Sequence, residues 1–84
     1  MKRATTESIR KAIQPFITVN DRGVDTIKQG AIDEVMDALM AEFSGIYCGV
    51  EEHRSGDLLL VVTSSARTKK KFYEVLVDEQ RGID

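Results

Sequence analysis

Few side chains in this sequence could carry covalent or acid–base chemistry. His53 is the only histidine, Cys48 the only cysteine, and Glu51 and Glu52 are the carboxylates nearest to them. A Cys–His pair at this spacing requires the chain to fold His53 back onto Cys48, and no third group completes a triad. We therefore expect Cys48 to be a small buried side chain, His53 to be hydrated, and the protein not to be an enzyme.

Metal and nucleotide sites have no better support. One cysteine and one histidine fall short of the three or four ligands of a zinc site. Asp33 and Asp37 lie one helical turn apart and could share a cation, but a hydrated acidic helix face explains the same spacing. The six glycines are scattered and form no phosphate-binding motif. The sequence predicts neither a metal nor another cofactor.

The sharpest chemical feature is a basic run, Arg67–Lys71, which two aromatic residues follow directly. Cations of this kind contact phosphates, and an exposed ring can stack on a base. The candidate nucleic-acid contacts are Arg67, Lys69, Lys70, Lys71 and Tyr73. The chain as a whole carries a net charge of −2, which repels a polyanion, and basic runs also serve to protect strand edges. Nucleic-acid binding is therefore the second hypothesis.

An acidic stretch without any lysine or arginine lies between Gln29 and His53. Asp33, Glu34 and Asp37 fall on one face of a predicted helix. They could dock on a basic surface of another protein, or on Arg67–Lys71 of a second copy of this chain, although an ordinary hydrated face is the simpler alternative. The sequence thus favours a non-catalytic protein-binding module, a small regulatory or inhibitory protein.

Two helices are expected in the first half of the chain. Thr5 or Thr6 can cap the first, which should end near Gln14 because Pro15 cannot continue it. A short extended piece, Phe16–Val19, and a turn at Asn20–Gly23 should follow.

The second helix is predicted from about Thr26 to Phe43, with Asp25 as its N-cap and Gly45 just beyond its end. Its apolar residues recur at helical spacing and cover a broad face.

The second half of the chain indicates strands. From Ile46 to Glu51 the apolar period is two, Arg54–Asp57 supplies a turn, and Leu58–Thr63 is apolar on both faces, as a central strand is. A loop should occupy Ser64–Thr68. Phe72–Val77 is predicted as a third strand because of its β-branched and aromatic residues, with a helix as the alternative.

These elements predict one α+β domain over residues 1–84, in which two helices pack on one face of an antiparallel sheet of about three strands. A frayed tail should begin near residue 80. The expected core residues are Ile13, Ile32, Val35, Leu39, Phe43, Cys48, Leu60 and Val62. No apolar run is long enough to span a bilayer, so we expect no membrane contact, and the lone cysteine favours the cytoplasm.

Overall fold

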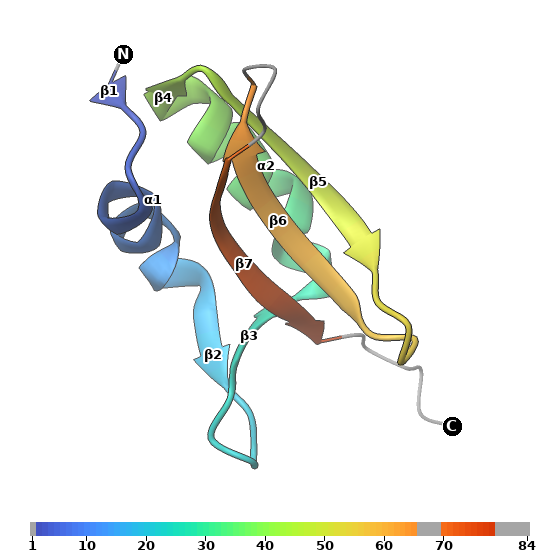
Figure 1. Ribbon diagram of the computed structural model, residues 1–84. Helices are drawn as coiled ribbons and strands as arrows, with labels where there is room; N and C mark the ends of the chain where they lie inside the picture. Colours follow the sequence, from blue (N-terminus) through green and yellow to red (C-terminus); the bar gives the residue numbers. More distant parts are fainter. Residues whose placement is uncertain (1, 66–69, 79–84) are drawn as a thin grey trace.

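Two helices and a five-stranded sheet form the fold in the computed structural model, which describes residues 2–65 and 70–78 (Figure 1). Helix α1 spans Thr6–Ile13 and helix α2 spans Ile32–Glu42. The strands of the sheet are β2 (Ile17–Val19), β3 (Asp25–Lys28), β5 (Ile46–Glu52), β6 (Leu58–Ser64) and β7 (Lys71–Asp78). The α+β class and the strand at residues 71–78 confirm the prediction.

The sheet is larger than predicted, and it is mixed. Its strand order is β2-β3-β7-β6-β5, and β3 runs parallel to β7 while the other neighbours are antiparallel. The extra strands, β2 and β3, come from the chain between the helices. A second, two-stranded sheet pairs β1 (Lys2–Arg3) with β4 (Phe43–Ser44). In Figure 1, α2 lies behind β5 and β6, and α1 lies beside β7.

The start of the second helix was predicted wrongly. Residues 26–28 belong to β3, in which Thr26 and Ile27 are buried, and a 3-10 turn at Gln29–Ala31 precedes α2. Asp25 is therefore the first residue of a strand and not a helix cap. Thr26 and Ile27 are both β-branched and so favour a strand. Gly30 has a low helix propensity and disfavours an extension of α2 toward its N-terminus.

The first helix begins and ends as the sequence indicated. Thr5 is its N-cap: the Ser8 backbone N–H donates to Thr5 Oγ1 at 3.1 Å, and the Thr5 backbone N–H donates to Ser8 Oγ at 2.9 Å. This reciprocal pair satisfies two amides that have no partner within the helix. Pro15 lies in the 3-10 turn Gln14–Phe16 that follows the helix.

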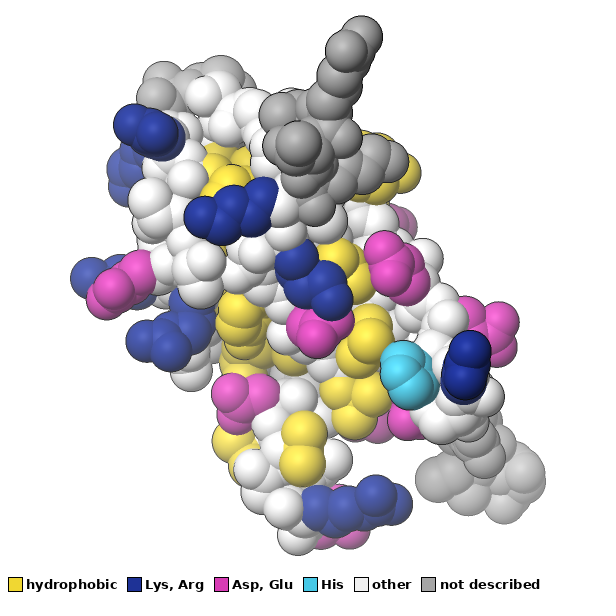
Figure 2. Space-filling view, in the orientation of Figure 1, with side chains coloured by type: hydrophobic (Ala, Val, Ile, Leu, Met, Phe, Trp, Pro, Cys, Tyr) yellow, Lys and Arg dark blue, Asp and Glu magenta, His cyan; other side chains and the backbone are white. Residues whose placement is uncertain are grey.

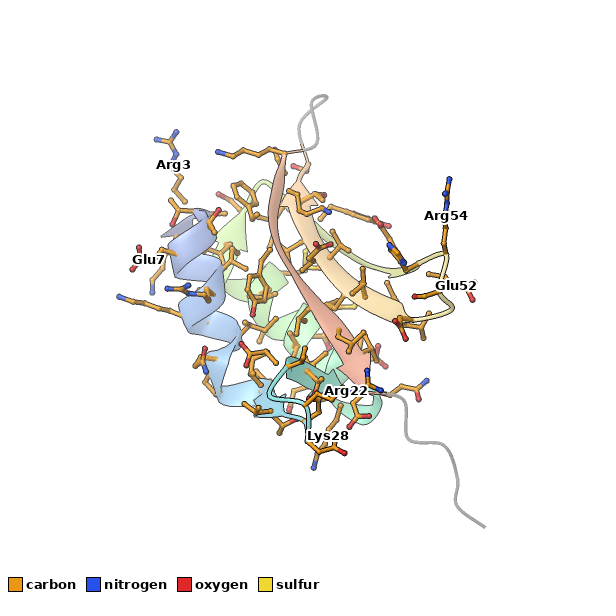
Figure 3. All side chains as sticks on the ribbon, turned by 60° about the horizontal axis from the view of Figure 1, so that its bottom comes forward. Arg3, Glu7, Arg22, Lys28, Glu52 and Arg54 are labelled. Atoms are coloured by element: carbon orange, nitrogen blue, oxygen red, sulfur yellow. The ribbon has the colours of Figure 1, made fainter. Side chains whose placement is uncertain are left out.

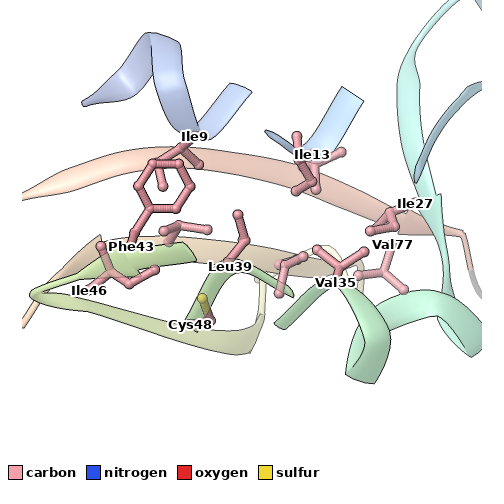
Figure 4. Close-up of a cluster of buried hydrophobic side chains, with 12 residues drawn as sticks. Ile9, Ile13, Ile27, Val35, Leu39, Phe43, Ile46, Cys48 and Val77 are labelled. Carbon is pink, nitrogen blue, oxygen red and sulfur yellow. The ribbon is translucent and has the colours of Figure 1, made fainter. Parts of the chain in front are cut away.

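One hydrophobic cluster joins both helices to the sheet. Ile9 of α1 and Phe43 point toward one another, and Ile27 of β3 lies beside Val77 of β7 (Figure 4). Every predicted core residue is buried except Ile32, which is partly buried and packs against the cluster. Within the described ranges, no helix is long and apolar enough to cross a membrane.

Candidate functional site

Cys48 and His53 do not form a reactive pair. The Cys48 side chain is 6% exposed and belongs to the hydrophobic cluster, and burial raises the pKa of its thiol. His53 lies in the turn after β5, where its Nδ1 is 3.3 Å from Ser55 Oγ. A raised pKa keeps the thiol protonated and unreactive. Among the described residues, no group of three or more His, Cys, Asp or Glu side chains could hold a metal ion.

The predicted nucleic-acid contacts are only partly placed, since Arg67 and Lys69 lie outside the described residues. Lys71 Nζ donates to Glu74 Oε2 at 3.0 Å, and Lys70 Nζ lies 5.9 Å from the centre of the Phe72 ring. Both cations are exposed at the start of β7. One of them is already paired with a carboxylate, so its charge is partly neutralised.

The aromatic rings beside these lysines are poorly placed for stacking on a base. Tyr73 is half-buried and packs against the core cluster. Burial is the main reason that its pKa is raised; Asp25 adds to the effect and Arg10 opposes it. Phe72 is also half-buried, with Lys70 over its ring. The geometry therefore provides phosphate-binding charges without an open aromatic face.

The basic region extends from Lys70 and Lys71 across to β1 and α1. Arg3 and Lys70 line a hollow of about 510 Å³, together with four hydroxyl side chains and no carboxylate. We call the group of cations formed by Lys2, Arg3, Arg10, Lys11, Lys70 and Lys71 the basic side; Lys and Arg side chains gather here in Figure 2.

The three predicted docking carboxylates, Asp33, Glu34 and Asp37, are all exposed on α2. None forms an ion pair with another described residue. Asp33 and Glu34 lie in the first turn of α2, whose N-cap, Ala31, makes no side-chain hydrogen bond. Negative charge at this end stabilises the helix, so these two carboxylates have a structural reason to be there. Asp37 lies beyond the first turn and has no such reason.

One ion pair shows how α2 is rotated about its own axis. Glu42 Oε1 accepts from Lys2 Nζ at 3.3 Å, so the Glu42 flank of α2 faces β1 and α1. At 100° per residue, the opposite flank carries Asp33, Asp37 and Met40. Because α2 packs behind β5 and β6, this opposite flank lies on the side of the β5 edge (Figure 1). Glu34 lies farther round, on the back of the helix.

Strand β5 forms the edge of the sheet beside this flank. Among the described residues, three of the five large exposed hydrophobic side chains belong to α2 or β5: Met40 is 48% exposed, Tyr47 60% and Val50 43%. Glu51 and Glu52 complete β5, and Glu52 and Arg54 lie together near the end of the hairpin, away from Arg3 and Glu7 (Figure 3). We call the region around this edge the α2–β5 surface. Asp33, Asp37, Met40, Val50 and Glu52 lie on the side of the helices, and Tyr47 and Glu51 lie on the open side of the sheet.

Sequence reasoning found half of this surface. It selected the carboxylates of α2, but it did not join them to β5, because neither the edge position of β5 nor the orientation of α2 can be read from periodicity. The stretch from Gly30 to Glu52, which contains no lysine or arginine, includes both α2 and β5 and was the sequence feature that could have linked them. Comparisons of the chain with protein-family models, with curated proteins and with solved structures give no match.

Proposed function

We propose that this protein is a non-catalytic binding module that docks a positively charged segment of another protein on the α2–β5 surface. One observation carries the proposal. The stretch from Gly30 to Glu52, which builds this surface, contains no lysine or arginine, and four of its six carboxylates belong to the surface. A surface of one sign attracts a partner of the opposite sign and rejects others.

The surface also offers apolar area to a partner. Met40, Tyr47 and Val50 are each more than two-fifths exposed, and a docked segment would remove part of this area from water. Each Å² of apolar surface that is buried contributes about 25 cal/mol. Carboxylates would then govern the encounter and the choice of partner, while the apolar side chains would supply most of the affinity.

This mode of action suits a small regulatory or inhibitory protein that works by contact alone. The free, buried Cys48 is compatible with a reducing compartment, and we place the protein in the cytoplasm on that basis. A second copy of this chain is the alternative occupant of the same surface.

Charge reversal on the α2–β5 surface tests the proposal. The variant Asp33→Lys/Asp37→Lys/Glu51→Lys should lose at least tenfold in affinity for a fluorescent oligolysine peptide at low salt, mainly through slower association. The matched control, Glu7→Lys/Asp21→Lys/Asp78→Lys, changes the net charge equally at exposed carboxylates outside the α2–β5 surface. It should keep most of the affinity. Equal losses in both variants would show that only net charge matters and would overturn the proposal.

Nucleic-acid binding is the second candidate. It rests on the hollow at the basic side, where Arg3 and Lys70 face no carboxylate. Phosphate groups are the ligands that two such cations would bind.

A further inference from the structure

The backbone of β5 makes hydrogen bonds on one side only. Two hydrogen bonds, one at each end of β5, show which of its residues bond to β6. The Ser65 N–H donates to the Gly45 carbonyl at 2.9 Å, and the His53 N–H donates to the Asp57 carbonyl at 2.8 Å. In an antiparallel pair, residues alternate between those that exchange bonds with the partner strand and those that point away from it. Tyr47, Gly49 and Glu51 therefore bond to β6, whereas Ile46, Cys48, Val50 and Glu52 direct their backbone groups away from the sheet.

This free edge has few of the features that usually protect an edge strand. Natural proteins shorten such strands, bend them with bulges, or place proline or charged residues, above all lysine, in them. The only charged residues of β5 are Glu51 and Glu52 at its end. Strand β5 is seven residues long, contains neither lysine nor proline, and pairs with β6 without a shift in register. At the opposite edge of the sheet, β2 has only three residues. Among the described strands, β5 is thus the one best able to accept another strand.

The two faces beside the edge differ in chemistry. On the side of the helices, a new strand would meet Val50 and the flank of α2 that carries Met40. On the open side it would meet Tyr47, Gly49 and Glu51. The Tyr47 ring lies over Gly49, since a Cβ atom at Gly49 would be 3.2 Å from Tyr47 Cε2. An added strand therefore fits best if apolar residues alternate with basic ones.

We propose that the positively charged partner segment docks as an extra strand along β5, hydrogen-bonded to the outward backbone groups of Ile46, Cys48, Val50 and Glu52. Its apolar side chains would face Val50 and Met40, and its lysines or arginines would lie near Glu51 on the open side of the sheet. Asp33 and Asp37 on α2 would attract the segment through its overall charge and would not contact its cations directly. This inference rests on the proposed function and names the form of the partner. A second copy is the less complementary occupant, because its own β5 and α2 supply no lysine or arginine to face Glu51.

Amide hydrogen exchange, followed by NMR on the full chain, tests strand addition residue by residue. In the free protein, the amides of Tyr47, Gly49 and Glu51 should exchange slowly, while those of Cys48, Val50 and Glu52 should exchange fast. A heptapeptide of alternating lysine and valine, at a concentration that saturates the protein, should slow exchange of the Cys48, Val50 and Glu52 amides at least tenfold. A peptide of the same composition, with its valines and lysines in two blocks, should not.

A backbone variant checks the same contact by affinity. Val50→Pro removes an outward N–H and leaves the bonds to β6 in place, so the alternating peptide should bind at least fivefold more weakly than to Val50→Ala. If Val50→Pro does not fold, the exchange pattern of the wild type decides alone.

The outcomes separate the two proposals. Peptide binding that leaves the amides of Cys48, Val50 and Glu52 unchanged would overturn strand addition and leave docking on α2 intact. Failure of the wild type to bind either peptide would overturn both. A dimer that protects these amides without any peptide would replace the basic segment by a second copy, and so would overturn the inference as well.

Discussion

The α2–β5 surface and the basic side differ in how their charges are used within the molecule. On the basic side, Lys2 pairs with Glu42 and Lys71 pairs with Glu74. On the α2–β5 surface, no carboxylate is paired with another described residue. The basic side also joins the beginning of the chain to β7, whereas the α2–β5 surface comes from one continuous stretch. Arg3, Arg10, Lys11 and Lys70 also form no ion pair with another described residue, so the distinguishing feature of the α2–β5 surface is unpaired charge beside the free edge of β5. For this reason we assign docking to the acidic surface.

The largest expected effect separates the buried face of α2 from its exposed flank. Leu39 is 1% exposed, while its neighbour Met40 is 48% exposed. Leu39→Ala should lower the free energy of unfolding by about 2–5 kcal/mol, because it leaves a cavity in the core. Met40→Ala should lower it by less than about 1 kcal/mol and should weaken peptide binding instead. Chemical denaturation of both variants checks this contrast. Similar losses of stability would mean that Met40 serves packing and is not part of a docking surface.

The sequence was sufficient for elements whose periodicity had one interpretation. The capping residues of α1 and the β5–β6 hairpin were predicted with nearly the observed bounds, since Thr5, Pro15 and the turn at Arg54–Asp57 act locally. The core followed from the same periodicities.

The prediction failed where one pattern fits two structures. Ile27 has the spacing of a helix residue, but it is buried as part of β3, where it pairs in parallel with Val77 some fifty residues away. No local pattern reveals such a long-range partner. For the same reason, the free edge of β5 became visible only with the strand order.

The next effect concerns the basic side. Changing Arg67, Lys69, Lys70 and Lys71 to alanine should alter little if docking is the function, because wild-type binding to single-stranded DNA at physiological salt should already be weaker than micromolar. If these residues do bind phosphates, each lost contact should reduce the slope of log affinity against log salt by about 0.7–0.9. Retention on immobilised DNA across a salt gradient measures this. Micromolar wild-type binding that disappears in the variant would place nucleic acid first.

A smaller effect tests whether the inner side of β5 is sealed. Burial raises the pKa of Cys48, so its contribution to stability is complete below about pH 8.5, the pKa in an unfolded chain, and is lost as pH rises through the folded value. Stability should therefore fall above about pH 8.5 more steeply in the wild type than in Cys48→Ala. Thermal unfolding at a series of pH values gives the two slopes. Fast labelling of the native thiol at pH 7 would show that the inner side of β5 is open.

The smallest expected effect belongs to the link between the two regions. The Lys2–Glu42 pair joins β1 to α2 at 3.3 Å, with both side chains well exposed. A double-mutant cycle with Lys2→Ala and Glu42→Ala should give a coupling energy of about 0.2–1 kcal/mol that decreases with salt. A larger coupling would mean that this pair holds the two regions together, and peptide binding would then be expected to depend on it.

The most direct test of the account is an NMR titration of the isotopically labelled protein with the alternating lysine–valine heptapeptide. The account predicts that backbone resonances from Ile32 to Glu52 shift, with the largest changes in β5, while those of α1 and the start of β7 stay in place. Shifts confined to the basic side, or spread evenly over both regions, would contradict it.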